Sequence, residues 1–391
     1  MKRKLLPIAI AAASFSVAGV SNAEINMNGF ATISGGAVLT EDKSINGLDE
    51  DINFQTESNI GLQFSSEMGD GINATAQFIA RGDNNWGVEA EWAYISYDVT
   101  DSVKVLAGKQ RSPFYMYSDY KDVGYAYHWA AVPDNVYWIG FDSSNGVSVI
   151  MNNYFGDLDS TFQIMYSTID KPDSSLGPLD LSMLQLNWTA VYDFATFRVG
   201  YTNAKLNIEN EGLDTLAASW VDAGAGAGFD GQKIADNILI KDDTATFIGA
   251  GLTLDFDSYF FVAEISQLNL ETSLLGINTN SYIGAGYRVG DFTVHATYML
   301  SNETATESDV LYEDIPDAVL PALGALTGPT EATFEGQRAE YHAISAGVRW
   351  DFNPSAALKF DLTNQVDDKD NADPEYEPNR LFYRLAMTTV F

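Results

Sequence analysis

The sequence predicts an all-β fold, a sixteen-stranded antiparallel barrel that spans a membrane. Segments of about ten residues with alternating apolar and polar side chains recur sixteen times, and the connectors between them are short and long by turns. No convincing helical period of about ten residues interrupts the series, which favours β-structure throughout. The predicted strands are 25–36, 59–67, 72–81, 88–98, 103–111, 146–155, 160–169, 181–192, 196–206, 246–256, 259–270, 280–289, 292–300, 342–352, 357–366 and 380–391.

The connectors of the predicted strands sort by parity. Short turns follow only the even-numbered strands, as at 68–71, 99–102 and 156–159, whereas the long connectors follow odd-numbered strands. All short turns therefore lie at one end of the predicted barrel, and all long loops lie at the other. A soluble β-sandwich has no reason to sort its connectors so strictly, whereas outer-membrane barrels have short periplasmic turns and long extracellular loops.

The two faces of each predicted strand differ in polarity. In the second strand, Ile60 and Leu62 alternate with Asn59 and Gln63. The last strand places Arg384 on the face opposite its mostly apolar side. A polar inner face holds water and an apolar outer face contacts lipid. Because hydrocarbon cannot satisfy a backbone amide, such a sheet has to close and leave no edge.

Aromatic residues flank the predicted short turns. Tyrosine and tryptophan have an apolar body and a polar tip, and they favour the boundary between lipid and water. The aromatic residues at this level are Tyr192, Phe194, Phe256, Tyr259, Tyr287, Phe292, Trp350, Phe352 and Phe391. We expect them to form one of the two aromatic girdles of a membrane barrel.

The N-terminus predicts a secretory signal peptide, residues 1–23. The basic stretch "MKRK" precedes an apolar run, and "SNA" supplies a small-residue cleavage site that ends at Ala23. No later stretch approaches the roughly 18 uninterrupted apolar residues of a transmembrane helix. We therefore expect an exported chain with one domain, the barrel of residues 24–391.

The charge balance excludes nucleic acid as a partner. The chain has 54 acidic and 21 basic residues, a formal net charge of −33. Contacts to phosphate need lysine and arginine, which are scarce here. The absence of cysteine leaves no disulfide and no thiolate metal site.

With these features the chain resembles the Gram-negative general porins, the sixteen-stranded trimeric family of the outer membrane. The resemblance covers the whole chain after the signal peptide. It is carried by the strand count, the hairpin "NIGLQFSSEMGDGINATAQFIA", the segment "LAGKQRSPFYMYSDYKDVGYAYHWA" and the terminal Phe391. Thr389 departs from the family, whose members more often have a larger apolar residue there.

The resemblance implies an assembly and a set of partners. It implies a homotrimer in the cell outer membrane, in contact with outer-membrane lipid and lipopolysaccharide. Phe391 is implied to be the signal that the outer-membrane assembly machinery reads. Small apolar positions in the first five strands, such as Ala31, Ile33, Ala74 and Ala76, are the expected trimer contacts.

The resemblance also implies that the third long loop, after the fifth strand, folds into the barrel and narrows the channel. This loop, 112–146, is rich in aromatic residues and acidic residues. Aromatic side chains tend to be at least partly buried, which supports an inward position. The constriction residues we expect are Asp119, Asp122, Asp134, Tyr117 and Trp129.

Basic residues are expected on the pore wall opposite this loop. Strand parity puts six of them on the polar face, although parity gives the face and not the height in the channel. They are Arg81, Lys109, Arg111, Arg198, Arg349 and Arg384. Glu89 and Glu91 lie on the polar face of the fourth strand, and they tilt the expected lumen potential towards negative.

These features predict a water-filled channel for passive diffusion of small hydrophilic solutes and ions, with a preference for cations. One alternative is a sugar-specific porin, in which the aromatic loop stacks against pyranose rings. Another is a structural or adhesive barrel whose acidic loops bind cations or lipopolysaccharide.

An enzymatic function has little support in the sequence. His128, His295 and His342 are scattered, and neither an HExxH nor a GxSxG motif occurs. The glycine-rich "AGAGAGFDG" around Gly224 lacks a βαβ context and is interpreted as a flexible loop. The acidic run 367–377 is interpreted as a solvated loop. No cofactor or metal is expected.

Overall fold

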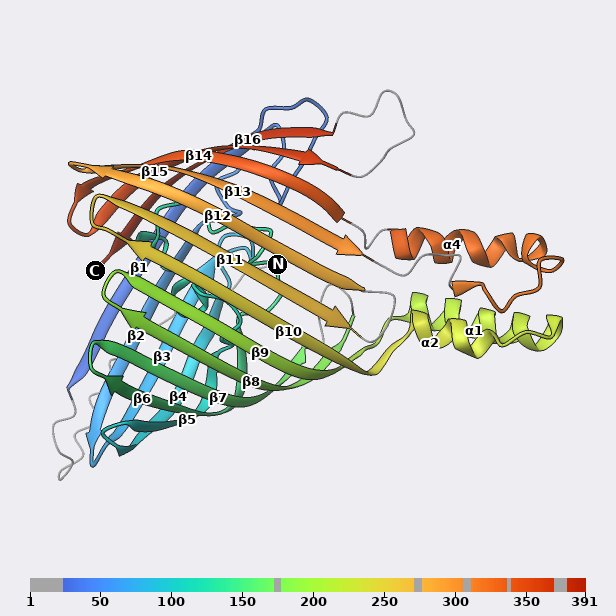
Figure 1. The fold of residues 1–391 in the computed structure, drawn as a ribbon, viewed down its shortest axis with the longest axis horizontal. Coiled ribbons are helices and arrows are strands. Elements are labelled where there is room, and N and C mark those ends of the chain that lie inside the picture. The colour runs from blue at the N-terminus through green and yellow to red at the C-terminus, as the bar shows by residue number, and fades with distance from the viewer. Residues whose placement is uncertain (1–23, 172–176, 271–275, 305–310, 336–338, 369–377) are drawn as a thin grey trace, which may run out of the picture.

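The computed structural model describes residues 24–171, 177–270, 276–304, 311–335, 339–368 and 378–391. These residues form a closed barrel of sixteen antiparallel strands, and the prediction of this fold is confirmed (Figure 1). The strands are β1 Ile25–Val38, β2 Asn59–Gly69, β3 Ile72–Arg81, β4 Val88–Thr100, β5 Val103–Arg111, β6 Ser143–Phe155, β7 Leu158–Lys171, β8 Leu179–Tyr192, β9 Ala195–Ile208, β10 Ile240–Asp255, β11 Tyr259–Leu270, β12 Ile277–Val289, β13 Phe292–Thr304, β14 Ala339–Asn353, β15 Ala356–Asp367 and β16 Asn379–Val390.

The barrel closes between its first and last strands. Ala31 of β1 lies opposite Thr389 of β16, and the pairing continues to Val38 and Phe382. Phe391 extends the seam, because its amide donates to the carbonyl of Gly29 at 2.9 Å and its carbonyl accepts from the Gly29 amide at 2.6 Å. The sheet therefore has no open edge, as a lipid environment requires.

The two ends of the barrel differ in their connectors. Each even-numbered strand up to β14 is followed by a turn of two or three residues, and these turns gather at the end called here the turn end (Figure 1, left). The long connectors gather at the opposite end, called here the loop end. Phe391 lies at the turn end, beside the last turns.

The outer surface of the barrel is apolar. At the turn end, the ring of Phe292 stacks on that of Trp350 with centroids 5.9 Å apart, and both rings are exposed. Further exposed aromatic residues at this level are Tyr192, Phe194, Tyr259, Tyr287, Phe352 and Phe391. Exposed apolar side chains on a closed barrel mark the surface that faces lipid, and the aromatic ones lie where a girdle is expected.

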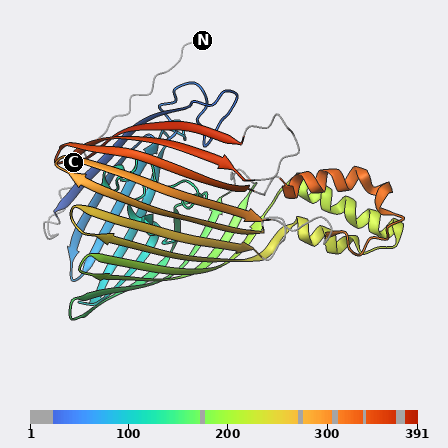
Figure 2. The same ribbon diagram turned by 45° about the horizontal axis from the view of Figure 1, so that its top comes forward.

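Two long connectors contain helices, so the prediction that no helix interrupts the strands is wrong. The connector between β9 and β10 contains α1 Glu211–Ala227 and α2 Gly231–Ile238. The connector between β13 and β14 contains η3 Leu320–Leu323 and α4 Gly324–Glu335. Figures 1 and 2 show these helices side by side beyond the loop end, and we call residues 211–238 and 311–335 the helical protrusion. None of the described helices is long and apolar enough to cross a bilayer.

The glycine-rich segment around Gly224 is part of α1, so its interpretation as a flexible loop is also wrong. The Asn210 side chain caps the first turn by accepting from the amide of Leu213, and Gly228 ends the helix in a left-handed conformation. A side chain on Gly224 would place its Cβ 2.5 Å from the amide nitrogen of Gly231. The small residues therefore allow α1 and α2 to pack closely.

Candidate pore constriction

The connector between β5 and β6 lies inside the barrel, and we call residues 112–142 the inner loop. It contains two short 3₁₀ turns, η1 Ser118–Tyr120 and η2 Gly124–Ala126. Near its start, Arg198 of β9 donates to the Pro113 carbonyl at 3.1 Å. Near its middle, the Trp129 indole donates to Thr297 of β13 at 2.8 Å. Contacts to such distant strands show that the inner loop crosses the lumen.

A cluster of charged groups ties the inner loop to one side of the wall. Arg81 of β3 donates to both carboxylate oxygens of Asp122, at 3.1 and 2.9 Å, and also to Glu91 at 2.9 Å. Arg111 of β5 donates to the same Asp122 and lies 3.5 Å from Asp142. Burial alone would raise the pKa of Asp122, but Arg111 and Arg81 outweigh it and hold the pKa well below its usual range. Asp122 therefore stays ionised and paired.

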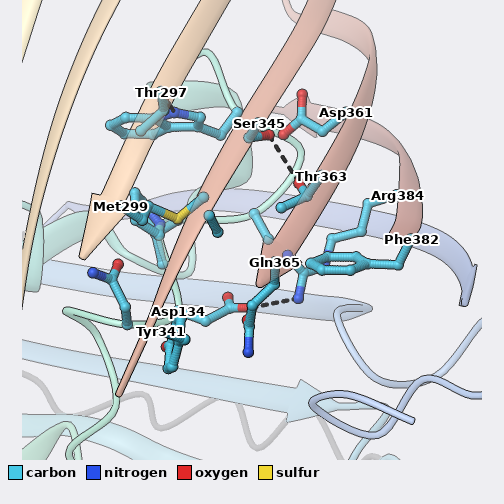
Figure 3. A pocket seen from close by; sticks show the side chains of 16 residues that line it. Asp134, Thr297, Met299, Tyr341, Ser345, Asp361, Thr363, Gln365, Phe382 and Arg384 are labelled. Atoms are coloured by element: carbon cyan, nitrogen blue, oxygen red, sulfur yellow. Dashed lines mark hydrogen bonds and ion pairs between the residues drawn. The ribbon is translucent and has the colours of Figure 1, made fainter. Parts of the chain in front are cut away.

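A second ion-pair cluster lies between the inner loop and β16. Arg384 donates to Asp134, and the pair borders a small cavity of about 30 Å³, enough for about one water molecule (Figure 3). Glu57 lies 3.4 Å from the same guanidinium. Burial raises the pKa of Glu57, Arg384 opposes this and Asp134 adds to it, with a net increase.

Backbone carbonyls of the inner loop provide a third set of contacts. Lys359 of β15 is fully buried, and its ammonium donates to the carbonyls of Gly124, Tyr127 at 2.6 Å and Trp129 at 2.9 Å. Arg349 of β14 donates to the Tyr127 carbonyl at 2.8 Å. Three carbonyls that converge on one ammonium satisfy all of its donors, so the turn is held by a charge without a carboxylate partner.

A buried carboxylate on β11 provides a fourth group of contacts between the wall and the inner loop. Glu264 of β11 accepts from the Tyr137 hydroxyl at 2.6 Å, from the Tyr282 hydroxyl at 3.0 Å and from the Met116 amide at 2.7 Å. Asp361 of β15 likewise accepts from an inner-loop amide. Sequence reasoning missed Lys359, Glu264 and Asp361. The parity rule that selected Arg384 would have found two of them, because Asp361 lies opposite Arg384 in register and Lys359 lies two residues along the same face.

The remaining expected residues lie in more open positions. Asp119 is exposed and forms no ion pair with any residue that the structure describes. Glu89 is half-exposed and 3.9 Å from Arg81. Lys109 is half-buried and lines a cavity of about 600 Å³ at the loop end, together with Glu89 and Glu91.

The expected aromatic residues are buried. Trp129 is 2 % exposed and Tyr117 is 7 % exposed, and their rings meet edge to face with centroids 5.7 Å apart. A polar cavity of about 560 Å³ lies on the turn-end side, lined among others by Arg288, Asp255 and Asp351. Space for water therefore lies on both sides of the inner loop, while the centre of the loop is packed.

Two of the three histidines are brought together. The rings of His128 and His295 are 4.7 Å apart, and His295 lies 3.3 Å from Asp361. Burial lowers the pKa of His128, and the neighbouring His295 lowers it further. Within the described part of the chain, no serine hydroxyl bonds to either ring, and no group of three or more candidate ligands could hold a metal ion.

The family follows from a sequence comparison. A family model described as Gram-negative porin matches residues 9–377. The chain belongs to the Gram-negative porin family. Family and fold together indicate a channel protein of the outer membrane. A search of curated proteins found no significant match to this chain.

Solved porin structures share the fold at low sequence identity. OmpF of Salmonella typhi, in a complex with daunomycin, has a TM-score of 0.58 and 14% identity, over 94% of this chain and 98% of that one. The outer membrane channel DcaP of Acinetobacter baumannii has a TM-score of 0.57 and 14% identity, over 94% and 97%. A loop-deletion mutant of OmpT of Vibrio cholerae has a TM-score of 0.56 and 10% identity, over 95% and 100%.

Proposed function

We propose that this porin is a water-filled channel for passive diffusion of small hydrophilic solutes and ions, that it favours cations, and that it catalyses no reaction. The supporting observation is that most of the wall cations are already engaged. Arg81, Arg111 and Arg384 pair with carboxylates, and Lys359 binds loop carbonyls. The positive potential that would attract anions is therefore largely cancelled at the constriction.

The remaining acidic residues then determine the sign of the electrostatic potential in the channel. The chain has a formal net charge of −33, and Asp119 on the inner loop is exposed without an ion pair among the described residues. A low-dielectric mouth with one sign of charge concentrates counter-ions and repels co-ions. Exposed charges are screened within a Debye length of about 8 Å at physiological ionic strength, so the preference weakens as salt rises.

The sugar-specific alternative loses support from the burial of its aromatic residues. Stacking against a pyranose ring needs an exposed aromatic face, and Tyr117 and Trp129 present none. Tyr120 and Trp138 are more exposed, but they line different cavities on opposite sides of the inner loop. They do not form a continuous track for a sugar.

The proposal includes the assembly of the protein. We place the loop end outside the cell and the turn end in the periplasm, after cleavage of residues 1–23, which lie outside the described residues. The exposed Phe391 at the barrel seam is available as the assembly signal. The outer face of β1 and β3, with Ile33 exposed and Ala31, Ala74 and Ala76 half-buried, is the proposed contact of a homotrimer. The rest of the apolar outer surface contacts lipid and lipopolysaccharide.

Reversal potentials in a tenfold KCl gradient test the proposal. Purified protein in a planar bilayer is expected to give single-channel current steps in the absence of any added substrate. The sign of the reversal potential should be that of a channel selective for potassium over chloride. The magnitude should be larger in dilute than in concentrated KCl. A chloride-selective sign would mean that the wall arginines dominate, and the absence of steps would favour the structural barrel.

A further inference from the structure

An apolar cavity lies in the loop-end half of the barrel, apart from the inner-loop charges. It has a volume of about 460 Å³ and lies between the end of the inner loop and the wall from β7 to β13. Phe114, Trp138 and Phe141 line it from the inner loop. We call it the vestibule cavity.

The wall of this cavity reverses the polarity expected of a water-filled pore. On β8, Leu181 and Met183 are buried and line the cavity. Asp180 is on the opposite, outer face of the same strand and is exposed. The neighbouring strands repeat this arrangement. The further apolar wall residues are Leu179, Ala204, Leu206, Ile208, Ala245, Phe247, Leu268 and Leu270. Passive diffusion of hydrophilic solutes gives no reason for such a surface, whereas ligand-binding cavities are mostly apolar with a few placed polar groups.

Two unpaired acceptors lie together at one edge of the cavity. Leu268 of β11, Asn278 of β12 and Glu303 of β13 are consecutive partners in register, so their side chains share one face. Asn278 is 9 % exposed, and its side-chain oxygen has no hydrogen-bond partner. Glu303 is half-buried, and its carboxylate forms no ion pair or hydrogen bond with any residue that the structure describes. Buried polar groups normally have hydrogen-bond partners, and these two acceptors have none. A ligand with a hydrogen-bond donor can supply the missing partner.

The only other charged residue among those lining the cavity in the described structure is Lys171. It is at the end of β7, on the far side of the cavity wall from Glu303 on β13. Lys171 also borders the adjoining polar cavity, whose lining has five acidic residues and three basic ones, Lys171 included. Its charge therefore lies in acidic surroundings, while Glu303 lies in apolar ones.

We propose that the vestibule cavity binds small amphipathic cations, with the apolar body between Phe141 and Phe247 and an ammonium group at Glu303 and Asn278. The volume lies within the range of roughly 300–1,000 Å³ that is typical of small-molecule sites. A cation here gains an ion pair in a partly desolvated place, and it covers apolar surface that water otherwise contacts. This inference goes beyond diffusion, and binding is measurable without any ion current.

A matched ligand series tests the charge of the occupant. The protein is reconstituted in lipid nanodiscs, which avoids detergent tails in the cavity, and 4-phenylbutylamine, 4-phenylbutanol and 4-phenylbutyrate are titrated by calorimetry. The amine is expected to bind at least tenfold more tightly than the acid, with the alcohol between them. Equal affinities would overturn the role of Glu303. Tighter binding of the acid would assign recognition to Lys171 and overturn the proposal, and so would the absence of binding by the amine.

Two variants and a control test whether the ligand binds in the vestibule cavity. Glu303→Gln keeps the shape and removes the charge, so the amine should lose at least fivefold in affinity while the alcohol is unaffected. Ala245→Phe fills the cavity and should abolish binding of both. Asp317→Asn, an exposed acid of the helical protrusion, should change nothing. Each variant is checked for a folded barrel by its heat-dependent gel migration. Unchanged binding in both cavity variants would place the ligand elsewhere.

Discussion

The inner loop and the helical protrusion are both long connectors of the loop end, yet they are held in opposite ways. The inner loop is fixed by charges that reach it from the barrel wall, such as Arg111 on Asp122 and Lys359 on Tyr127. The helical protrusion is fixed by apolar packing within itself, because the fully buried Trp220 stacks on Tyr312 with centroids 5.5 Å apart. A connector inside a polar lumen needs partners on the wall, whereas one outside has to build its own core.

Exposed ion pairs underline the difference. In the helical protrusion, Lys233 lies 2.8 Å from Glu313, and Asp214 lies 2.7 Å from Lys241 of β10, all in exposed positions. Such pairs contribute little to stability because water and salt screen them. The buried pairs of the inner loop lack this screening, so removing one partner leaves a charge without compensation.

The largest expected difference between the two regions is in conductance. Removing 115–132 from the inner loop should raise single-channel conductance severalfold and leave the barrel folded, because the strand pairing does not depend on this loop. Removing 211–238, the helices α1 and α2, should leave conductance nearly unchanged. Planar-bilayer recordings of both deletions decide this. Equal effects, or loss of surface epitopes alone in the first deletion, would place the inner loop outside the conducting path.

The next effect concerns the Asp122 cluster. Asp122→Asn leaves Arg81 and Arg111 with only Glu91 and Asp142, so we expect a loss of about 3 kcal/mol in the free energy of unfolding. The reversal potential should also shift towards chloride. Asp214→Asn, which removes an exposed carboxylate of the helical protrusion, is the matched control and should change neither quantity. Urea unfolding in lipid vesicles and reversal potentials provide the two measurements.

The pH dependence of the Asp122 cluster follows from the direction in which the pKa of Asp122 is shifted. The pKa of Asp122 is lower in the folded than in the unfolded chain, so its stabilisation is present above the unfolded value of about 3.9 and is lost only as pH falls through the lower, folded value. The inner loop should therefore remain in place as pH falls to about 4, and the single-channel conductance should stay at its neutral-pH value. A rise in conductance at about pH 4 towards that of the inner-loop deletion would contradict the depressed pKa.

The strands and their parity could be predicted from the sequence because alternation with a period of two is local information. The partners of the wall charges could not. Lys359 and Tyr127 are 232 positions apart, and nothing in either neighbourhood indicates the other. The helices were missed for a different reason, since the alanines and glycines of α1 have little hydrophobic periodicity, and only the tertiary contact of Gly224 with Gly231 shows their use.

A smaller effect is expected from the ammonium at the centre of the inner loop. Lys359→Met keeps the length of the side chain but leaves the carbonyls of Gly124 and Trp129 without their donor. Hydrogen bonds to a charged group contribute about 1.5–3 kcal/mol, and we expect a loss of that order. Trypsin should then cleave the inner loop at Lys121 in the folded barrel. Lys241→Met, which removes an exposed lysine beside α1, is the control, and cleavage at Lys121 in both variants or in neither would contradict the tether.

The smallest effect on the channel is expected from the core of the helical protrusion. Trp220→Ala removes the ring that stacks on Tyr312 and whose indole donates to Thr330 at 2.8 Å. Truncation of a buried tryptophan costs about 3–5 kcal/mol, more than four helical segments that pack mainly on one another are expected to withstand. The protrusion should therefore unfold locally, and trypsin should cleave at Lys233 within α2. The barrel should keep its heat-dependent migration and its conductance, because the wall charges that hold the inner loop do not involve these helices. A change in conductance as large as that of the inner-loop deletion would mean that the helical protrusion supports the constriction, and the contrast between the two regions would no longer hold.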